Sequence, residues 1–445
     1  MLWSSGGGLP LQRERPFERR FGPADSGQFW LTQGAKPRVG CHRASSDRWR
    51  FVTWAFFALR SSRRLLRSHD ARPRLLRRSH DEETSVLLKV AVGSTHDGRG
   101  RCLLAAEDAD AGDCVIREKA SFTHDMGGTV SEQGAALIWE QFLQLPEEVQ
   151  DAIWGLYCPE PSVEALEESP GYLLSSEEQR RLLGILKVNS VKLRGPGAGV
   201  FLTISRANHS CRPTCAFVLG EDGMCSLVAV RKIKAGEEVT VSYISENSLL
   251  LPVLQRRSAL YRPWQFHCHC ERCVGIDDTR GHRCSLCGRG IQWASADGAW
   301  QACDNCGGHM DDKELRQCLS RLWLRYNAME PLRVEAELAS LQFQRGCDGP
   351  VERKGANWMS DLISLHRTLR DSPPPSPGLD THWIGSSIAA LAAEAHLWRG
   401  EFDEAAAAAK ARVAYVKRVL GGDTPGLRKM EATIDIARRM KKREL

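Results

Sequence analysis

A polar cluster, Asn208 to Cys211 ("NHSC"), follows the apolar run "AGVFLTI". A cysteine two residues after a histidine could be a nucleophile beside its base, one of a pair of metal ligands, or a neighbour with no shared task. The sequence of the cluster alone leaves these three alternatives open. The rest of the chain has to decide between them.

Four cysteines near the middle of the chain have the spacing of a zinc site. Cys284 and Cys287 form one C-x2-C pair, Cys303 and Cys306 form another, and fifteen residues separate the two pairs. Zn²⁺ takes four thiolates tetrahedrally, and a gap of two residues lets both sulfurs of a pair reach one ion. We therefore predict a structural zinc site in a small zinc ribbon over residues 281–310.

Three other cysteines, Cys268, Cys270 and Cys273, form C-x-C-x2-C, which is one ligand short of a closed structural site. The candidates for the fourth ligand are His267, His269, Cys215 and Cys211. The two histidines are so close in sequence to the cysteines that bonding one of them would strain the turn. A ligand from far upstream would instead fix this segment to the core, which would give Cys211 a role.

Two kinds of pattern alternate along the rest of the chain. Short apolar runs and Gly-rich turns predict strands, at 86–122, 199–204, 214–219, 225–230 and 238–244. Apolar residues at helical spacing predict a helical insert over about 130–192, with a helix start at Ser175 or Ser176.

The region 311–445 is again predicted to be helical, apart from a Pro-rich linker at 372–378. Within it, the segment around Gly400 predicts two antiparallel helices, either an ordinary hairpin or a tetratricopeptide (TPR)-like unit. The patterns together predict an α+β fold.

The N-terminal residues carry most of the basic charge. The 445-residue chain has a net charge of +6, yet residues 1–80 contain 17 Lys and Arg against 5 Asp and Glu. We expect residues 1–85 to be a disordered basic arm that would suit nucleic acid or an acidic partner. An organelle transit peptide and a wrongly assigned start are the alternatives. Its longest apolar run, 51–59, is too short to span a membrane, so we expect no membrane association.

Five motifs resemble, in kind and order, those of a SET-domain protein methyltransferase. They are "GRG" at 98–100, "VNS" at 188–190, "NHSC" at 208–211, "GEEVTVSY" at 236–243 and "FHCHCERC" at 266–273. Within this family the chain is similar to the SET-and-MYND (SMYD) type, which has a helical C-terminal region. The resemblance implies a SET domain over 86–250 and a post-SET zinc segment over 251–280.

The resemblance also implies roles for single residues. Tyr243 would be the catalytic tyrosine, and Cys211 would be the fourth ligand to the zinc of Cys268, Cys270 and Cys273. Tyr261 and Trp264 would line the channel of the substrate lysine. The cofactor, S-adenosylmethionine (SAM), would be bound by Gly98, Arg99, Gly100, Asn189, Asn208, His209, Tyr243 and Phe266. The opening cluster would then serve cofactor binding and a structural metal instead of nucleophilic catalysis.

The sequence departs from the SMYD type in two places. Residues 123–187 contain one cysteine, Cys158, so we expect no zinc-binding MYND module there. Trp264 stands where many relatives have a tyrosine, so this part of the lysine channel would offer no hydroxyl.

The resemblance implies a SAM-dependent protein-lysine N-methyltransferase with two structural zinc sites and a lysine-bearing protein as substrate. The patterned cysteines suit metal binding in a reducing compartment, and we expect the protein in the nucleus or the cytoplasm. We also expect it to be a monomer. The alternative is an inactive SET scaffold that binds partners or nucleic acid through its zinc ribbon, basic arm and helical tail.

Overall fold

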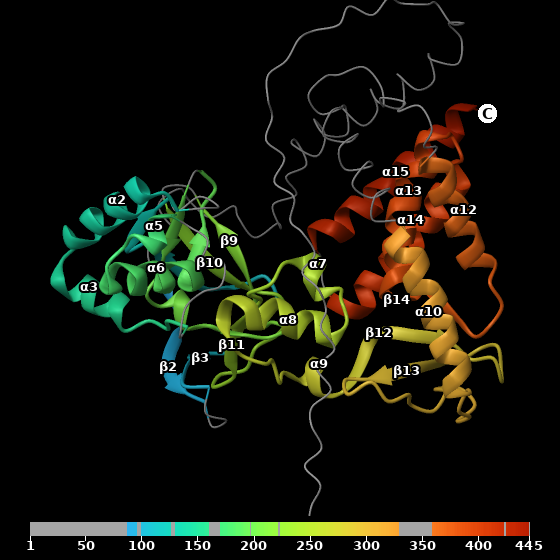
Figure 1. Ribbon diagram of the computed structural model, residues 1–445, viewed down its shortest axis with the longest axis horizontal. Helices are drawn as coiled ribbons and strands as arrows, with labels where there is room; N and C mark the ends of the chain where they lie inside the picture. Colours follow the sequence, from blue (N-terminus) through green and yellow to red (C-terminus); the bar gives the residue numbers. More distant parts are fainter. Residues whose placement is uncertain are drawn as a thin grey trace, which may run out of the picture. The chain divides into compact units, whose positions relative to one another are not determined.

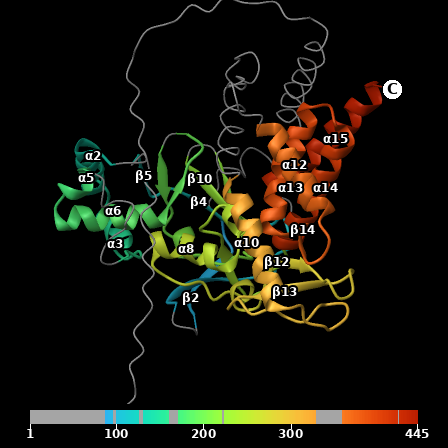
Figure 2. The same ribbon diagram turned by 45° about the vertical axis from the view of Figure 1, so that its right-hand side comes forward.

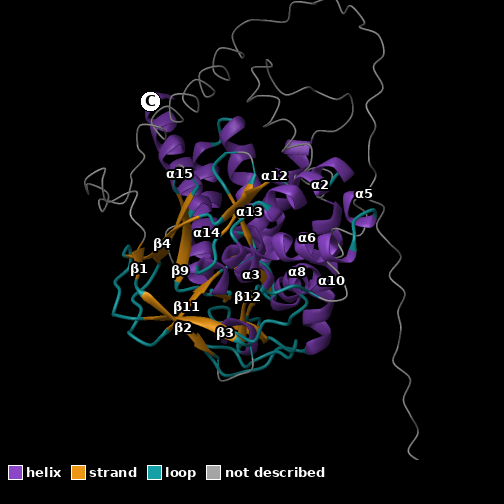
Figure 3. Cartoon of the chain, turned by 90° about the vertical axis from the view of Figure 1, so that its left-hand side faces the viewer, coloured by secondary structure: helices purple, strands orange, loops and turns teal. Residues whose placement is uncertain are grey.

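The computed structural model describes residues 87–95, 99–125, 130–159, 170–195, 197–220, 223–328, 358–421 and 424–444. All of these belong to the second of two compact units, Arg50–Leu445. The predicted arm at 1–85 and the predicted cofactor contact at Gly98 lie outside the described residues. The described part is a mixed α+β fold with a strand-rich core and a helical C-terminal region, as predicted (Figures 1 and 3).

Two four-stranded sheets form the core, and each joins strands from both sides of the helical insert. The first has the order β1-β4-β10-β9 and the second the order β2-β3-β11-β8. Their strands are β1 (Leu87–Leu88), β2 (Val90–Ser94), β3 (Arg101–Ala105), β4 (Cys114–Lys119), β8 (Asn208–His209), β9 (Cys215–Leu219), β10 (Met224–Ala229) and β11 (Glu238–Val241). Leu103, Ile116, Leu227 and Val239 are fully buried between them. Burial of such side chains is the main stabilising contribution to a core of this kind.

A short parallel pairing brings the "NHSC" cluster beside the strand that leads to Tyr243. Asn208 pairs with Thr240 and His209 with Val241. The turn before this pairing, η2 (Ile204–Arg206), is fixed by a buried carboxylate: Glu118 accepts hydrogen bonds from the backbone N–H groups of Thr203 (3.0 Å) and Ile204 (2.9 Å). Burial raises the pKa of Glu118, and these backbone donors oppose the rise.

The helical insert forms where its periodicity predicts. Its helices are α2 (Glu132–Leu143), α3 (Glu147–Trp154), α5 (Pro170–Leu173) and α6 (Glu177–Asn189). Ser176 begins α6 with a capping box to Gln179, which confirms the predicted helix start. Phe142 packs edge-on against Trp154 at the centre of the insert. A three-stranded sheet lies at the base of the insert. Its strands, in order, are β5 (Phe122–His124), β7 (Ala198–Val200) and β6 (Ser190–Lys192).

The polypeptide after Tyr243 first runs through three short helices, α7 (Glu246–Leu249), α8 (Val253–Trp264) and α9 (Glu271–Val274). A three-stranded sheet with the order β13-β12-β14 follows, formed by β12 (Ile276–Arg283), β13 (Ile291–Ser295) and β14 (Ser376–His382). The predicted linker 372–378 is therefore wrong in its second half, where β14 begins. Pro377 lies opposite His282 on this edge strand, a position that tolerates the missing N–H of proline.

The C-terminal helices pack on this sheet and on one another. They are α10 (Asp312–Ala328), α12 (Trp358–Asp371), α13 (Trp383–Trp398), α14 (Phe402–Leu420) and α15 (Pro425–Glu444). Helices α13 and α14 both contact β14 (Figures 1 and 2). Gly400, with φ of +76°, makes the turn between them and confirms the predicted hairpin. No helix in the described ranges is long and apolar enough to cross a membrane.

Helix α14 also holds the segment between Tyr243 and β12. The buried Tyr415 hydroxyl donates to the carbonyl of Leu250 (2.6 Å), and Arg418 lies over the Trp293 ring, 4.7 Å from its centre. Arg418 also donates to the carbonyls of Asp278 and Asp380. These contacts attach the C-terminal helices to the polypeptide that carries the second cysteine set.

Candidate active site and metal centres

Cys211 lies with the three cysteines of the C-x-C-x2-C segment. The four sulfurs, from Cys211, Cys268, Cys270 and Cys273, lie within 4.8 Å of one another, and those of Cys211 and Cys273 are 3.5 Å apart. Sulfurs placed tetrahedrally about 2.3 Å from one Zn²⁺ would be about 3.8 Å apart. The arrangement therefore fits a zinc ion. Cys215, an alternative ligand in the sequence, lies in strand β9, outside this group.

The ribbon cysteines form a second group of the same kind. Cys284 and Cys306 have sulfurs 3.9 Å apart, those of Cys287 and Cys303 are 3.8 Å apart, and all four lie within 4.8 Å. The backbone N–H of Gly290 donates to the Cys287 sulfur (3.3 Å) and lowers the pKa of this thiol. Both groups could hold zinc, and they are the two such groups in the part of the chain that the structure describes.

Tyr243 follows β11 and points its hydroxyl at the turn before Asn208. The hydroxyl donates to the carbonyl of Ala207 (2.8 Å). The ring lies 5.1 Å from the Trp264 ring and 6.4 Å from the Phe266 ring, which meets it edge-on at 89°. Burial raises the pKa of Tyr243, so the phenol is neutral at neutral pH.

The side chain of His209 connects Tyr243 with the first cysteine group. Its Nδ1 accepts from the backbone N–H of Tyr243 (3.0 Å), and its Nε2 lies 3.3 Å from the Cys211 sulfur. Burial lowers the pKa of His209 to about 4, so the ring is neutral at neutral pH. With Nδ1 accepting, the ring proton is on Nε2 and faces the sulfur. The family resemblance implied only a cofactor contact for His209, so this connection was missed.

Asn208 and Arg99 meet at a residue that the sequence analysis did not single out. Glu238 accepts from Asn208 Nδ2 (2.8 Å) and forms a two-point ion pair with Arg99 (3.2 and 2.8 Å). Asn208 Nδ2 also lies 3.2 Å from the carbonyl of Arg101. Gly100, with φ of +88°, makes the adjoining turn. Glu238 belongs to the "GEEV" part of the motif that ends in Tyr243, and this position in the motif could have identified it as a site residue.

Asn189 lies at the C-terminal end of α6, where its amide binds protein carbonyls. Its Nδ2 donates to Tyr157 (2.7 Å) and to Ile185 (2.8 Å). The carbonyl of Asn189 accepts from the hydroxyl of Ser205 (3.1 Å), one turn before Asn208. The "VNS" and "NHSC" motifs are thus joined through η2.

The two predicted channel residues have different surroundings. Trp264 contacts Tyr243, as above, and its Nε1–H donates to the carbonyl of Val188 (3.0 Å). Its own carbonyl accepts from the hydroxyl of Tyr157 (3.0 Å), a residue the sequence analysis did not identify. Tyr261 is half exposed and stacks on His267, with ring centres 4.9 Å apart. Of the two, Trp264 is the one with a described contact to Tyr243.

Comparison with known proteins identifies the core. Residues 100–244 match the SET domain family. The histone-lysine N-methyltransferase SMYD3 of Mus musculus is 28% identical over 142 residues, which are 32% of this chain and 29% of that protein. The histone-lysine N-methyltransferase SET5 of Meyerozyma guilliermondii is 35% identical over 109 residues, 24% of this chain and 20% of that protein.

The histone-lysine N-methyltransferase ASHR1 of Arabidopsis thaliana is 37% identical over 82 residues, 18% of this chain and 16% of that protein. The chain thus spans less than a third of the length of these three relatives. The family match spans Cys211 and Tyr243, so the chain carries a SET domain, and it is similar to the SMYD type of histone-lysine methyltransferase.

Proposed function

We propose that this protein is a SAM-dependent protein-lysine N-methyltransferase. The observation that carries the proposal is the position of the Tyr243 hydroxyl, which donates to the Ala207 carbonyl beside "NHSC" while its ring packs against Trp264 and Phe266. A neutral phenol whose proton is already engaged presents oxygen lone pairs to a reacting methyl group. Methyl transfer needs such a positioned oxygen and an apolar wall.

Each residue near Tyr243 would have a separate role in methyl transfer. SAM would supply a methyl group on a positively charged sulfur. Tyr243 would orient the methyl group and the lysine amine, and the rings of Trp264 and Phe266 would exclude water from them. The substrate lysine must lose its proton before it attacks, because its pKa of about 10.4 keeps it charged at neutral pH.

The proposed cofactor residues are Arg99, Gly100, Asn189, Asn208, His209 and Phe266, together with Gly98. The ring of Phe266, whose centre is 6.2 Å from that of the His209 ring, would stack on the adenine. The Glu238 carboxylate, held by Asn208 and Arg99, fits the charged amino-acid end of SAM. The two cysteine groups would hold structural zinc and take no part in the transfer.

The substrate class is proposed from the names of the relatives, which are histone-lysine methyltransferases. A lysine of histone or of another protein would then be methylated, in the nucleus or the cytoplasm, by a monomer. The basic N-terminal residues would add contacts to nucleic acid or to an acidic partner.

The test is methyl transfer from isotopically labelled SAM to proteins of a cell lysate and to histones. The change Tyr243→Phe keeps the ring and removes the hydroxyl, so turnover should fall about 100-fold or more while SAM affinity changes little. Tyr326→Phe is the matched control, because this tyrosine lies in α10, outside the proposed cofactor and substrate residues. An unchanged rate and unchanged product mass in a folded Tyr243→Phe variant would contradict the assignment.

A non-catalytic scaffold is the second candidate, and one observation favours it. The amide nitrogens of Asn189 and Asn208 already donate to protein acceptors. Calorimetric titration with SAM separates the two candidates. A scaffold without a cofactor site would give no binding heat, whereas the enzyme would bind SAM and label a protein lysine.

A further inference from the structure

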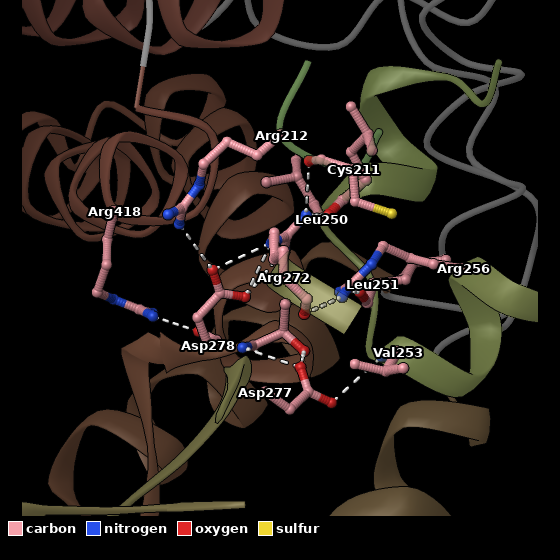
Figure 4. Close-up of polar contacts among 12 residues, drawn as sticks. Cys211, Arg212, Leu250, Leu251, Val253, Arg256, Arg272, Asp277, Asp278 and Arg418 are labelled. Carbon is pink, nitrogen blue, oxygen red and sulfur yellow. Dashed lines mark hydrogen bonds and ion pairs between the residues drawn. The ribbon is translucent and has the colours of Figure 1, made fainter. Parts of the chain in front are cut away.

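Arg256 is a buried cation next to a cysteine of the first group. It lies in α8, and its side chain is fully buried. Nη1 donates to the carbonyl of Leu251 (2.6 Å), and Nη2 donates to the carbonyl of Arg272 (3.2 Å) (Figure 4). Nη2 also donates to the sulfur of Cys273 (3.6 Å). Two of these acceptors are neutral carbonyls, so the sulfur is the one that can carry charge.

A guanidinium keeps its proton at any pH at which a protein is folded. Arg256 therefore cannot avoid the desolvation cost of its buried charge by becoming neutral. A buried charge without a counter-charge is strongly destabilising. The nearby carboxylates have other partners: Asp277 accepts from the Val253 N–H, and Asp278 pairs with Arg272 (Figure 4). Asp277 also pairs with Arg280. The described hydrogen bonds of Arg256 include no carboxylate.

The cysteine group supplies a negative charge in hydrogen-bond contact with Arg256, whereas the Asp277 carboxylate acts on it without a hydrogen bond. Four thiolates around one Zn²⁺ carry a net charge of two negative units. We infer that Arg256 is the charge partner of the zinc centre of Cys211, Cys268, Cys270 and Cys273, and that its N–H to Cys273 holds this sulfur in place. Arg256 is thus a positioning residue of the metal centre. The inference needs zinc in this group but does not depend on methyl transfer.

Two neighbouring arginines make different contacts. Arg257 donates to the carbonyls of Cys268 and Cys273 (both 3.0 Å) and is partly exposed, so it binds backbone and not sulfur. Arg272 donates to the carbonyl of Leu249 (2.7 Å) and has Asp278 as its counter-charge. Arg257 is therefore a matched control for a nearby guanidinium without a sulfur contact.

The ribbon centre is a second control within the same chain. Among the described hydrogen bonds, its sulfurs accept from the neutral donors Gly290 N–H (3.3 Å) and Asn305 Nδ2 (3.6 Å). Cys306 is exposed, so solvent can screen the charge of this centre. Removal of the charge on Arg256 should affect one zinc ion and leave the other unchanged.

The experiment measures zinc retained by the full chain against a graded series of chelator-buffered free zinc, without SAM or substrate. Wild type should bind two ions, and the ribbon ion is identified with Cys306→Ser. We expect Arg256→Gln to weaken one site about 10- to 100-fold, the usual effect of a lost outer contact to a metal ligand. Arg256→Lys keeps the charge and should weaken it less. Arg257→Gln, which loses contacts to the ligand carbonyls but no contact to sulfur, should weaken the same site less than Arg256→Gln does.

Four outcomes would overturn the inference. They are an unchanged titration for Arg256→Gln, an equal loss at both sites, an equal loss in Arg256→Lys and Arg256→Gln, and no zinc in the first group of the wild type. If Arg256→Gln does not fold, Arg256→Lys against Arg257→Lys supplies the comparison. In that comparison Arg256→Lys must lower the zinc affinity of the first cysteine group more than Arg257→Lys does.

Discussion

Trp264 uses both of its polar groups to bind the helical insert. Its indole N–H donates to Val188 and its carbonyl accepts from Tyr157, while its ring lies 5.1 Å from that of Tyr243. The wall beside Tyr243 is therefore fixed by residues that precede the "NHSC" cluster by 20 positions or more. A change of this ring alters both the room at Tyr243 and the attachment of the insert.

Trp264→Phe tests this residue under the proposed function. The smaller ring leaves more room for an amine that already carries methyl groups, so we expect more methyl groups per lysine. Loss of the hydrogen bond to Val188 should lower the free energy of unfolding by about 1 kcal/mol. Mass spectrometry of the product and urea unfolding measure the two effects. An unchanged product distribution would show that Trp264 does not limit the space.

The sequence could predict residues that belong to motifs but not the partners that hold them. Tyr243 and Cys211 stand in motifs with a fixed order, so their importance was readable. Glu238, Tyr157 and Glu118 act through pairings that depend on which strands and turns become neighbours in space. The Asn208–Glu238 bond, for example, follows from the parallel pairing of β8 with β11, which no local pattern shows.

Strand β8 is only two residues long, yet two sites depend on it. Asn208 and His209 pair with β11 beside Tyr243, and Cys211 follows directly. A strand this short has little stability of its own. Its position therefore depends on Glu118 on one side and on the cysteine group on the other.

Cys211→Ser should show this dependence. We expect elemental analysis to find two zinc ions per wild-type chain and one in the variant, because zinc binding at such a site contributes directly to folding. SAM binding should be lost together with the zinc, since Asn208 and His209 lose their anchor. Cys215→Ser is the control, because this cysteine is buried in β9 and outside the group. Two zinc ions in a folded Cys211→Ser variant would show that another residue is the ligand.

The hydrophobic periodicity and the turn residues of the sequence predicted most of the helices and strands. The insert helices, the capping of α6 at Ser176 and the hairpin at Gly400 all follow from local patterns. Strand β14 does not, because its start reads "SPG" after three prolines and its partner β12 is about 100 residues earlier. An edge strand is formed by its neighbour as much as by its own sequence.

Across the whole molecule, several histidines are buried in neutral form. Burial lowers the pKa of His124 and of His366 to about 4 and holds that of His382 well below its usual value. In the unfolded chain each would have a pKa near 6.5. Between pH 6.5 and 4 the unfolded state therefore binds more protons, so these residues favour folding above pH 6.5 and less and less as the pH falls.

His366→Gln isolates one of these contributions. His366 Nδ1 lies 3.2 Å from His396 Nε2, far in sequence from the cysteine groups, so zinc loss in acid affects variant and wild type alike. We expect the unfolding free energy of wild type to fall more steeply between pH 6.5 and 4, by up to about 1.4 kcal/mol per pH unit. Urea unfolding at graded pH measures both slopes. Parallel slopes would show that His366 does not titrate on unfolding.

The pairing of the core strands also determines how the chain can reach its fold. Ile116 in β4 pairs with Leu227 in β10, 111 positions later, and Leu103 in β3 pairs with Val239 in β11, 136 positions later. Closing loops of this length is slow. The pairing of Phe122 with Val200 at the base of the insert brings the chain on either side together. An insert that has already formed would therefore shorten the loop that the core must close, because Phe122 and Val200 flank it.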